Sequence, residues 1–323
     1  MTQKGYYSLG TVVTNGVIVN LADDQVPCPA GTYQGEIEQS SCDNASAGHY
    51  SLGTYTHNGV TFPATGETAC VAGTYQPNTG QSSCIDADAG YYAHSGTGSG
   101  NGTVNQQACA VGTWQNQTGQ SECILAESGY YSLGTTTLNG AVTNLANQQV
   151  ACGSGYYSLY QESTPGSSRN ACNATQAGYY SNGTITVNGA VVTSTAQVPC
   201  PAGTYQANEA QASCTIASAG FYANGTQGGF NVASTVTGDS TEQERCYEGT
   251  WQNQTGQASC HLAESGYYSI GTQTYNGSVT YLSLQQVPCP AGTYSNYLVS
   301  TPGIDRVSCT AVSYTHLTLP TKA

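Results

Sequence analysis

Short runs of β-prone residues alternate with turn residues along the whole chain, and helical periodicity is nowhere persuasive. Thr184–Val187 and Ala190–Thr193 are two such runs, joined by Asn188-Gly189. Asn-Gly between β-prone runs predicts a hairpin with a type I′ turn, because both central residues of that turn need positive φ. The dipeptide recurs between similar runs at Asn15-Gly16, Asn58-Gly59, Asn139-Gly140 and Asn276-Gly277.

A second pattern, which we call the cassette, is a segment bounded by two cysteines, and it occurs seven times. Each cassette has glycine three residues, and an aromatic residue five residues, after its first cysteine. The second cysteine follows the first by 14 residues in five cassettes and by 20 in two. The pairs are Cys28 and Cys42, Cys70 and Cys84, Cys109 and Cys123, Cys152 and Cys172, Cys200 and Cys214, Cys246 and Cys260, and Cys289 and Cys309. We therefore predict an all-β, elongated tandem array of small disulfide-stapled β-hairpin modules.

The even, regularly spaced cysteines indicate a disulfide framework formed in an oxidising compartment. Large aliphatic residues are sparse, and a module of about 40 residues cannot rely on a hydrophobic core alone, so crosslinks must help. Two pairings are open. Each cassette can close on itself, or each second cysteine can pair with the first cysteine of the next cassette. Within cassettes the spacing takes only two values, and the shifted pairing would strand Cys28 and Cys309, which favours closure within the cassette.

Glycine, an aromatic residue and tyrosine follow six residues after each internal second cysteine, as in Gly178-Tyr179-Tyr180. On a strand, alternate side chains face opposite sides, so the second tyrosine is predicted to be packed and the first more exposed. A longer period of 137 residues relates Trp114 to Trp251. The predicted modules are 1–47 (a partial repeat with the first cassette), 48–89, 90–128, 129–177, 178–219, 220–265 and 266–311.

The two ends suggest a piece of a longer polypeptide, since the chain begins inside a repeat and has no signal peptide. Glycine is expected six residues after Cys309, but position 315 is threonine. The run from Val312 to Thr321 resembles a translated sequencing adapter. Residues 312–323 are therefore predicted to be a non-native tail.

The net charge is −13, and only five residues are lysine or arginine. Binding to nucleic acid or to an anionic membrane surface needs clustered cations, so both are disfavoured. No apolar run approaches the roughly 18 residues of a membrane span, so no membrane insertion is expected in this fragment.

Eight Asn-x-Ser/Thr sequons are candidate N-glycosylation sites if the producer is a eukaryote. Asn116 and Asn253 occupy the same point of the long repeat, in an expected surface turn. The eight asparagines are Asn44, Asn101, Asn116, Asn173, Asn182, Asn224, Asn253 and Asn276.

Neither a metal site nor a catalytic site is evident. Asp86-Ala-Asp88 lacks the remaining ligands and the glycine of an EF-hand, and Asp23-Asp24 fits a solvated turn. No Cys-x2-Cys pair, nucleophile elbow or phosphate-binding glycine loop occurs. Four histidines fall at unrelated points of the repeat, namely His49, His57, His94 and His261. We expect no cofactor, no metal and no enzymatic activity.

The cassettes at Cys28, Cys200 and Cys289 all begin Cys-Pro-Ala-Gly-Thr-Tyr, and Gln211–Cys214 closes one of them as Gln-Ala-Ser-Cys. These cassettes resemble the cysteine-rich, ephrin-receptor-like repeats of large extracellular proteins. Here Thr215-Ile216 stand where that family usually has a further cysteine. The resemblance implies an extracellular, disulfide-stapled, repetitive surface protein without an enzymatic site.

Together these patterns predict a structural segment of an extracellular, glycosylated filament, appendage or surface coat that associates with itself into a fibre. The alternative is the stalk of a cell-surface adhesin or receptor whose binding domain lies outside this fragment. An atypical repeat would favour the alternative. The nearest candidate is the irregular segment Gly225–Arg245, which gathers Asp239, Glu242, Glu244 and Arg245, but a tolerated loop insertion is the preferred explanation of this segment.

Overall fold

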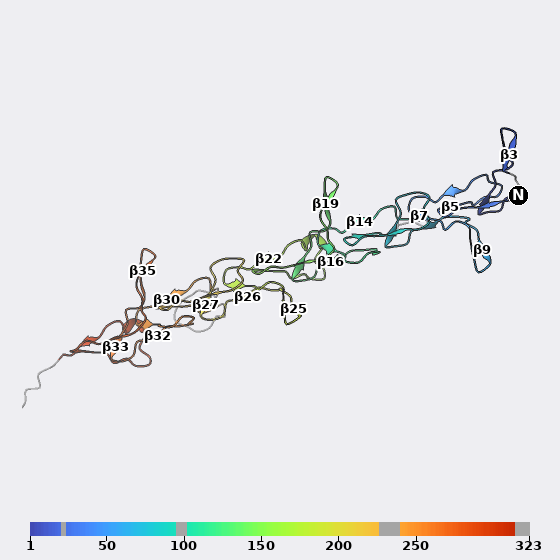
Figure 1. The fold of residues 1–323 in the computed structure, drawn as a ribbon. Coiled ribbons are helices and arrows are strands. Elements are labelled where there is room, and N and C mark those ends of the chain that lie inside the picture. The colour runs from blue at the N-terminus through green and yellow to red at the C-terminus, as the bar shows by residue number, and fades with distance from the viewer. Residues whose placement is uncertain (21–23, 95–101, 226–239, 314–323) are drawn as a thin grey trace, which may run out of the picture. The chain divides into compact units, whose positions relative to one another are not determined.

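The computed structural model describes residues 1–20, 24–94, 102–225 and 240–313 (Figure 1). Within these ranges the regular elements are β-strands and two 3₁₀ helices, η1 (Gly166–Ser168) and η2 (Gly303–Asp305). The strands form two-stranded sheets, each built from segments of one module. The predicted all-β tandem array of small modules is confirmed.

Three kinds of ribbon recur in the modules. The first, the tyrosine ribbon, pairs the Gly-Tyr-Tyr segment with the residues just before the next cassette. Its strands are β1 (Tyr6–Tyr7) with β4 (Val26–Pro27), β7 (His49–Tyr50) with β10 (Thr68–Ala69), β13 (Tyr91–Tyr92) with β14 (Gln107–Ala108), β23 (Tyr179–Tyr180) with β26 (Val198–Pro199), β29 (Phe221–Tyr222) with β30 (Glu244–Arg245), and β33 (Tyr267–Tyr268) with β36 (Val287–Pro288). In the fourth module, β17 (Tyr130–Tyr131) and β20 (Val150–Ala151) hold the same places.

The second kind, the cassette ribbon, pairs the aromatic residue of a cassette with the residues just after its second cysteine. These strands are β5 (Thr32–Tyr33) with β6 (Asp43–Asn44), β11 (Thr74–Tyr75) with β12 (Ile85–Asp86), β15 (Thr113–Trp114) with β16 (Ile124–Leu125), β21 (Tyr156–Tyr157) with β22 (Asn173–Ala174), β27 (Thr204–Tyr205) with β28 (Thr215–Ile216), β31 (Thr250–Trp251) with β32 (His261–Leu262), and β37 (Thr293–Tyr294) with β38 (Thr310–Ala311). The disulfide therefore closes each cassette beside its own ribbon.

The third kind is the projecting hairpin, which stands away from the body of its module (Figure 1). The hairpins are β2 (Val12–Thr14) with β3 (Val17–Asn20), β8 (Tyr55–His57) with β9 (Val60–Phe62), β18 (Thr136–Leu138) with β19 (Ala141–Asn144), β24 (Ile185–Val187) with β25 (Ala190–Val192), and β34 (Gln273–Tyr275) with β35 (Ser278–Tyr281). In each turn both Asn and Gly have positive φ, as at Asn188 (50°) and Gly189 (80°). The five predicted type I′ turns are confirmed.

In each module from the second to the seventh, one residue connects two consecutive cassettes through its backbone. We call it the bridge residue, and it follows directly after the tyrosine pair. Ser51 accepts a hydrogen bond from the N–H of Gly31 at 2.7 Å and donates its own N–H to the carbonyl of Gln81 at 3.0 Å. The same two bonds recur at Ala93, Ser132, Ser181, Ala223 and Ser269. The modules are thus linked by a ladder of backbone hydrogen bonds that does not depend on the side chain of the bridge residue.

Close packing at the ladder explains the glycine of the cassette. Gly31 has a φ of +89°, and a Cβ atom there would collide with the carbonyl oxygen of Gly80 in the next cassette. Only glycine combines this backbone conformation with so close an approach. The position three residues after the first cysteine is therefore set by the contact between cassettes.

The interior is built from small and polar side chains. Cys28, Ala45, Ala87 and Cys200 are fully buried, together with hydroxyl and amide side chains such as Thr175 and Gln252. Most large aliphatic side chains are exposed instead, among them Val71, Leu138 and Ile216. Stability must therefore come from disulfides and hydrogen bonds more than from apolar burial.

The expected contrast between the two tyrosines of a ribbon is seen in β33, and in the other ribbons it stays a prediction. Both aromatic residues are partly buried in β1, β7, β13, β17, β23 and β29, and only in β33 is the first, Tyr267, exposed. These strands have only two residues, and the residues flanking them bond to cassettes on both sides. Backbone hydrogen bonds on both sides therefore anchor these ribbons to the neighbouring cassettes.

The chain divides into two compact units, one of Met1–Val150 with Tyr160–Ala171 and one of Ala151–Leu159 with Cys172–Ala323. The division passes through the fourth cassette, between the predicted boundaries of the modules. Each unit contains its own run of cassettes joined by bridge residues, so the ladder is a property of each unit by itself.

Candidate glycan-acceptor and assembly surfaces

Each disulfide joins the two cysteines of one cassette, with Cα atoms 5.7 to 5.8 Å apart. Closure within the cassette is thus confirmed over the alternative pairing, and no cysteine is free. The bonds join Cys28 to Cys42, Cys70 to Cys84, Cys109 to Cys123, Cys152 to Cys172, Cys200 to Cys214, Cys246 to Cys260, and Cys289 to Cys309.

The third and sixth cassettes illustrate that the alternative pairing does not occur. Cys123 bonds to Cys109 and not to Cys152, the first cysteine of the next cassette. Cys260 likewise bonds to Cys246 and not to Cys289. A crosslink that closes a loop of this size contributes about 3 kcal/mol in the chain-entropy estimate. The disulfides therefore stabilise each cassette by itself, and other contacts must join one cassette to the next.

In every pair except Cys289 and Cys309 the first cysteine is buried and the second only partly buried, a difference that the sequence analysis did not predict. Cys109 and Cys246 are 1% and 0% exposed, whereas their partners Cys123 and Cys260 are only partly buried. The second cysteine is partly buried in the other five cassettes as well. Residues on both sides of each second cysteine are exposed or partly buried, so this end of the crosslink lies nearer the surface.

A buried glutamine shapes the loop of each short cassette, a role that the sequence analysis missed. Gln76 is 3% exposed, and its Nε2 donates to the carbonyl of Ser83 at 2.9 Å while its Oε1 accepts the N–H of Asn78 at 3.1 Å. The equivalent residues Gln34, Gln115, Gln206 and Gln252 make the same two bonds. The signal was available, because glutamine directly follows the aromatic residue in all five short cassettes.

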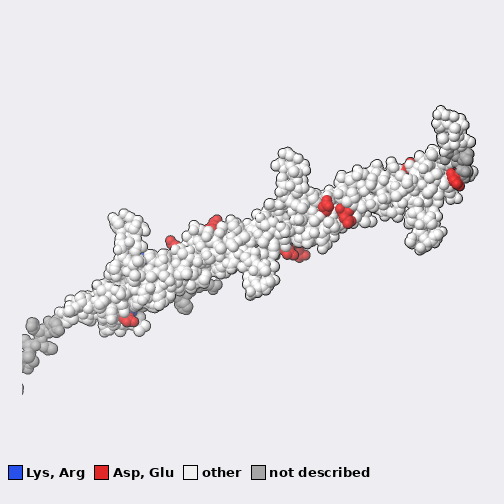
Figure 2. Space-filling model, in the orientation of Figure 1, with Lys and Arg blue, Asp and Glu red and all other residues white. Residues whose placement is uncertain are grey.

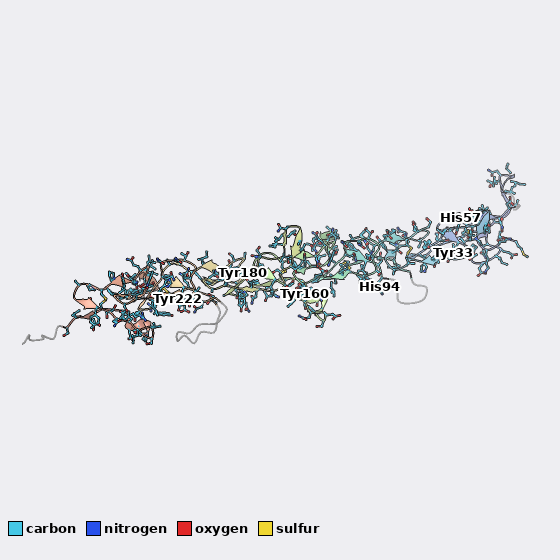
Figure 3. The ribbon with its side chains drawn as sticks, turned by 90° about the horizontal axis from the view of Figure 1, so that it is seen from below. Tyr33, His57, His94, Tyr160, Tyr180 and Tyr222 are labelled. Carbon is cyan, nitrogen blue, oxygen red and sulfur yellow. A yellow bond between two sulfur atoms is a disulfide. The ribbon has the colours of Figure 1, made fainter. Side chains whose placement is uncertain are left out.

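In the two long cassettes serine occupies the position of that glutamine, and a buried arginine makes hydrogen bonds to the loop instead. Arg169 is buried, and its guanidinium donates to the carbonyls of Ala126 (2.8 Å), Gln161 (3.1 Å) and Thr164 (3.1 Å). The same guanidinium lies 4.9 Å from the ring centroid of Tyr160 (Figure 3). Arg306 repeats this arrangement with Tyr297 in the second unit. Two of the five cations of the chain are thus structural.

The carbonyl that follows each cassette ribbon is satisfied in one of two ways. After a short cassette such as the second, the carbonyl of Ala87 accepts the N–H of Gly119 from the next short cassette at 2.8 Å. Where the next cassette is long, the carbonyl of Ala126 accepts from Arg169 instead. The longer loop therefore substitutes a side-chain donor for a backbone donor at the same acceptor.

The sequon asparagines all lie at the surface where the structure describes them. Asn44, Asn116, Asn173, Asn182, Asn224, Asn253 and Asn276 are exposed. Asn101 lies outside the described residues. Asn116 and Asn253 occupy matching places in their cassettes, directly before a bend, and Asn276 is at the tip of a projecting hairpin. Exposure is the structural requirement for a glycan on the folded protein, and glycosylation of these residues stays a prediction.

Trp114 and Trp251 hold the aromatic position of the third and sixth cassettes, where the other five have tyrosine. The indole Nε1 of each is buried and has no hydrogen-bond partner among the residues that the structure describes. A buried donor without an acceptor costs about 1–3 kcal/mol. Tryptophan at these two positions therefore lowers the stability of the fold, and no hydrogen bond from the indole within the described chain offsets this loss.

The projecting hairpins expose apolar side chains without any charged residue except the titratable His57. Val60, Leu138 and Val191 are 56%, 65% and 56% exposed, and Ile18 and Tyr275 are exposed likewise. No Asp, Glu, Lys or Arg occurs in residues 12–20, 55–62, 136–144, 185–192 or 273–281. Figure 2 shows the hairpins without charged residues, while carboxylates lie on the bodies of the modules. Each hairpin also has two strand edges, which are surfaces for pairing with another strand.

Glu244 joins two tyrosines at the end of the irregular segment. Its Oε2 accepts hydrogen bonds from the hydroxyls of Tyr222 (2.6 Å) and Tyr247 (3.0 Å), and the two rings lie 6.4 Å apart. Burial, followed by the hydrogen bond to Glu244, raises the pKa of Tyr222 well above its ordinary value. Burial also raises the pKa of Tyr247.

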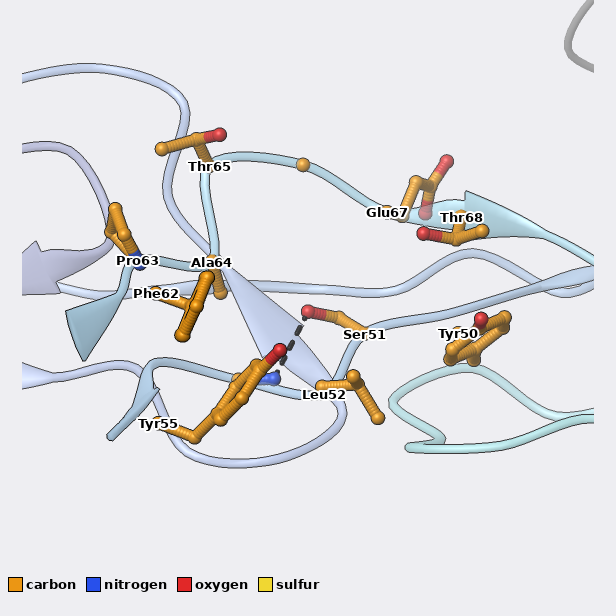
Figure 4. Close-up of a pocket in the computed structure, with 12 residues that line it drawn as sticks. Tyr50, Ser51, Leu52, Tyr55, Phe62, Pro63, Ala64, Thr65, Glu67 and Thr68 are labelled. Carbon is orange, nitrogen blue, oxygen red and sulfur yellow. Dashed lines mark hydrogen bonds between the residues drawn. The ribbon is translucent and has the colours of Figure 1, made fainter. Parts of the chain in front are cut away.

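The described residues form a cleft in each unit. The first, of about 380 Å³, lies beside the second hairpin and is lined by Tyr55, Phe62 and Glu67 among others (Figure 4). The rings of Tyr55 and Phe62 stack at 5.2 Å. The second cleft, of about 510 Å³, lies beside Arg245, Leu262 and Ile304. Neither gathers the titratable groups that acid–base or nucleophilic catalysis requires.

The histidines and aspartates considered in the sequence analysis lie at separate places in the described structure. His57, His94 and His261 are exposed, and His49 has its Nδ1 3.8 Å from Oε1 of Glu67. Asp86, Asp88 and Asp24 are surface residues, while Asp23 and Asp239 lie outside the described ranges. Among the described residues no group of three or more His, Cys, Asp or Glu side chains could hold a metal ion. The same residues contain no helix long and apolar enough to span a membrane.

Of the irregular segment, residues 226–239 lie outside the described ranges. The described part places Glu242 and Arg245 at the surface and Glu244 between the two tyrosines. The predicted gathering of these charges is therefore seen only for residues 242–245. Arg245 donates through Nη1 to the carbonyl of Thr272 at 3.4 Å.

No protein-family model matches the chain, and no curated protein matches it either.

Proposed function

We propose that the chain is a structural segment of an extracellular filament, appendage or surface coat, that it carries N-linked glycans, and that it has no enzymatic activity. The observation that carries this proposal is the backbone ladder through the bridge residues. Ser51 and its equivalents join each cassette to the next by the same two bonds, irrespective of side chain. Modules linked in this way can be repeated in series, which suits a mechanical or space-filling role.

Several features support the extracellular setting. Seven disulfides are typical of chains that fold in an oxidising compartment. The seven described sequon asparagines are exposed, so glycans on them would not disturb the packed interior. The resemblance of the cassettes to ephrin-receptor-like repeats, with their extracellular setting, belongs to the same proposal.

The projecting hairpins are the surface through which copies of the chain associate. Their apolar side chains are exposed, and an isolated two-stranded hairpin is only marginally stable in water. The carboxylates on the module bodies repel another copy of a chain with net charge −13, whereas the hairpins carry no such charge. Edge-to-edge pairing between hairpins of two copies would extend each sheet and cover these side chains.

Light scattering and electron microscopy of the secreted chain test this proposal. We expect concentration-dependent assemblies, and we expect Val142→Lys combined with Val191→Lys to abolish them by placing charge on two hairpins. Val71→Lys is the matched control, because Val71 is 67% exposed on a module body. A wild-type chain that stays monomeric at all concentrations would contradict self-association.

The alternative is the stalk of an adhesin or receptor, and one observation favours it. Residues 226–245 of the sixth module contain no Asn-Gly pair in their sequence, and Arg245, an exposed residue, lines the larger cleft. Loss of cell-surface binding in an Arg245→Ser variant, with no change in assembly, would favour the stalk over the filament.

A further inference from the structure

We propose that the first N-acetylglucosamine of the glycans on Asn116, Asn182 and Asn253 packs against the aromatic ring two residues before each asparagine. The inference rests on the glycosylation in the proposed function and adds a binding surface to it. The aromatic residues are Trp114, Tyr180 and Trp251.

Burial of the intervening residue places ring and asparagine on the same side. Gln115, Ser181 and Gln252 are 4%, 2% and 0% exposed, whereas each flanking aromatic residue is partly buried and each asparagine is exposed. Alternate residues of an extended chain face opposite sides, so the two neighbours of a buried residue share the side away from it. At about 3.3 Å per residue, the ring and the asparagine start about 7 Å apart, which a sugar on the asparagine spans.

Equivalent modules put an apolar group where Asn182 stands. Leu52, Leu133 and Ile270 take this position, two residues after the second tyrosine, and they are 54%, 48% and 39% exposed. In the fifth module the tyrosine is Tyr180 and the residue two positions on is a sequon asparagine (Figure 3). A pyranose ring presents a face of C–H groups, so a sugar on Asn182 places an apolar surface beside Tyr180 at the position where these modules have leucine or isoleucine.

The presence of tryptophan at positions 114 and 251 also supports a contact between sugar and ring. The two tryptophans of the chain occur in the only two cassettes whose turn carries a sequon. Their indole N–H groups find no acceptor in the described chain, so the wider ring is not explained by hydrogen bonding. A wider ring does offer a sugar more contact area.

Other sequons form an internal comparison. Asn44, Asn173 and Asn276 are preceded at the same spacing by Cys42, Ala171 and Thr274, which are not aromatic. Asn224 follows Tyr222 by two residues, but Thr226 of its sequon lies outside the described residues, so it is left out of the proposal.

Fluorescence tests the inference directly, because the chain has only two tryptophans and both belong to the proposed contacts. The full chain is secreted from a eukaryotic host, and its glycans are trimmed enzymatically to one N-acetylglucosamine. Acrylamide quenching is then compared with that of the variant Asn116→Gln/Asn253→Gln. We expect a quenching constant about twofold lower in the trimmed protein, because the sugar shields the indole. The control Asn44→Gln/Asn173→Gln leaves quenching unchanged.

Mass spectrometry of glycopeptides separates the outcomes. Equal quenching with Asn116 and Asn253 occupied overturns the docking and leaves the glycoprotein proposal intact. If both asparagines lack a glycan while other sequons are occupied, the inference is overturned, because it requires glycosylation of Asn116 and Asn253. If the chain fails to form fibres, only the filament proposal is contradicted, because quenching is measured on the monomer.

Thermal unfolding tests the contact at Asn182. We expect Asn182→Leu to resist thermal unfolding as well as the trimmed protein does and better than Asn182→Gln. Equal loss of stability in both variants counts against the contact with Tyr180.

Discussion

Arg169 donates its Nη1 hydrogen to the carbonyl of Ala126 at 2.8 Å, and this bond replaces the backbone donor that short cassettes place at the equivalent acceptor. The guanidinium also holds two carbonyls of its own long loop and lies against Tyr160. A longer loop is thus kept in register by one side chain. The arrangement makes Arg169 the first residue to test.

Replacement of Arg169 by methionine should destabilise the fourth module by about 2–4 kcal/mol, because it leaves the buried carbonyl of Ala126 and two part-buried carbonyls without a charged donor. Chemical denaturation, with amide hydrogen exchange at Ser132 as a local probe, measures this loss. Arg245→Met is the control, since Arg245 is exposed and should change stability by less than about 0.5 kcal/mol. Equal effects of the two substitutions would show that the buried network does not stabilise the loop.

Gln76→Ala should cost about 2–3 kcal/mol, because the carbonyl of Ser83 and the N–H of Asn78 each lose a partner. Gln81 provides a matched control in the same cassette. Its exposed Nε2 donates only to the carbonyl of Thr79, so Gln81→Ala should have little effect. The midpoint of urea unfolding compares the two variants, and a larger loss for Gln81→Ala would contradict the assignment.

Removal of the second disulfide by Cys70→Ala/Cys84→Ala should cost about 3 kcal/mol through the greater entropy of the unfolded loop. The opened cassette also supplies the bridge contacts of Ser51 and Ala93, so protection should fall in the neighbouring modules as well. Hydrogen exchange followed by mass spectrometry maps this spread. Loss of protection confined to residues 70–84 would mean that the ladder does not couple the modules.

Alkaline pH should weaken the sixth module. Burial, with the hydrogen bond to Glu244, raises the pKa of Tyr222 in the folded state above its value in the unfolded chain. The folded state therefore holds this proton more tightly, so the stabilisation is complete below about pH 10 and is lost as the pH rises above it. Tyr222→Phe should lower stability at neutral pH by about 1 kcal/mol and make the alkaline decline shallower.

Denaturation midpoints at several pH values between neutrality and about pH 11 test this prediction. Tyr275→Phe serves as the comparison, because Tyr275 is 71% exposed on a projecting hairpin. An alkaline decline that is the same in wild type and in Tyr222→Phe would exclude Tyr222 as its source.

Local chemistry explains which features were predictable. The Asn188-Gly189 turn follows from the φ values that two adjacent residues can adopt. The bonds of Cys123 to Cys109 and of Cys260 to Cys246 follow from their short, regular separation, although their unequal burial does not. Each correct prediction depends on residues close together in the chain, which is why the repeat alone was enough to make it.

Only the tertiary structure decided how one module meets the next. The bonds of Ser51 to Gly31 and Gln81, and of Arg169 to Ala126, join residues that are far apart in the chain, so the spacing of motifs could not reveal them. The same holds for the alignment of Trp114 with Asn116, which depends on the burial of the residue between them. The sequence by itself determined the stapled module, because covalent closure and turn geometry are local. Packing determined the contacts between modules, because backbone donors and acceptors carry no signature in the side chains.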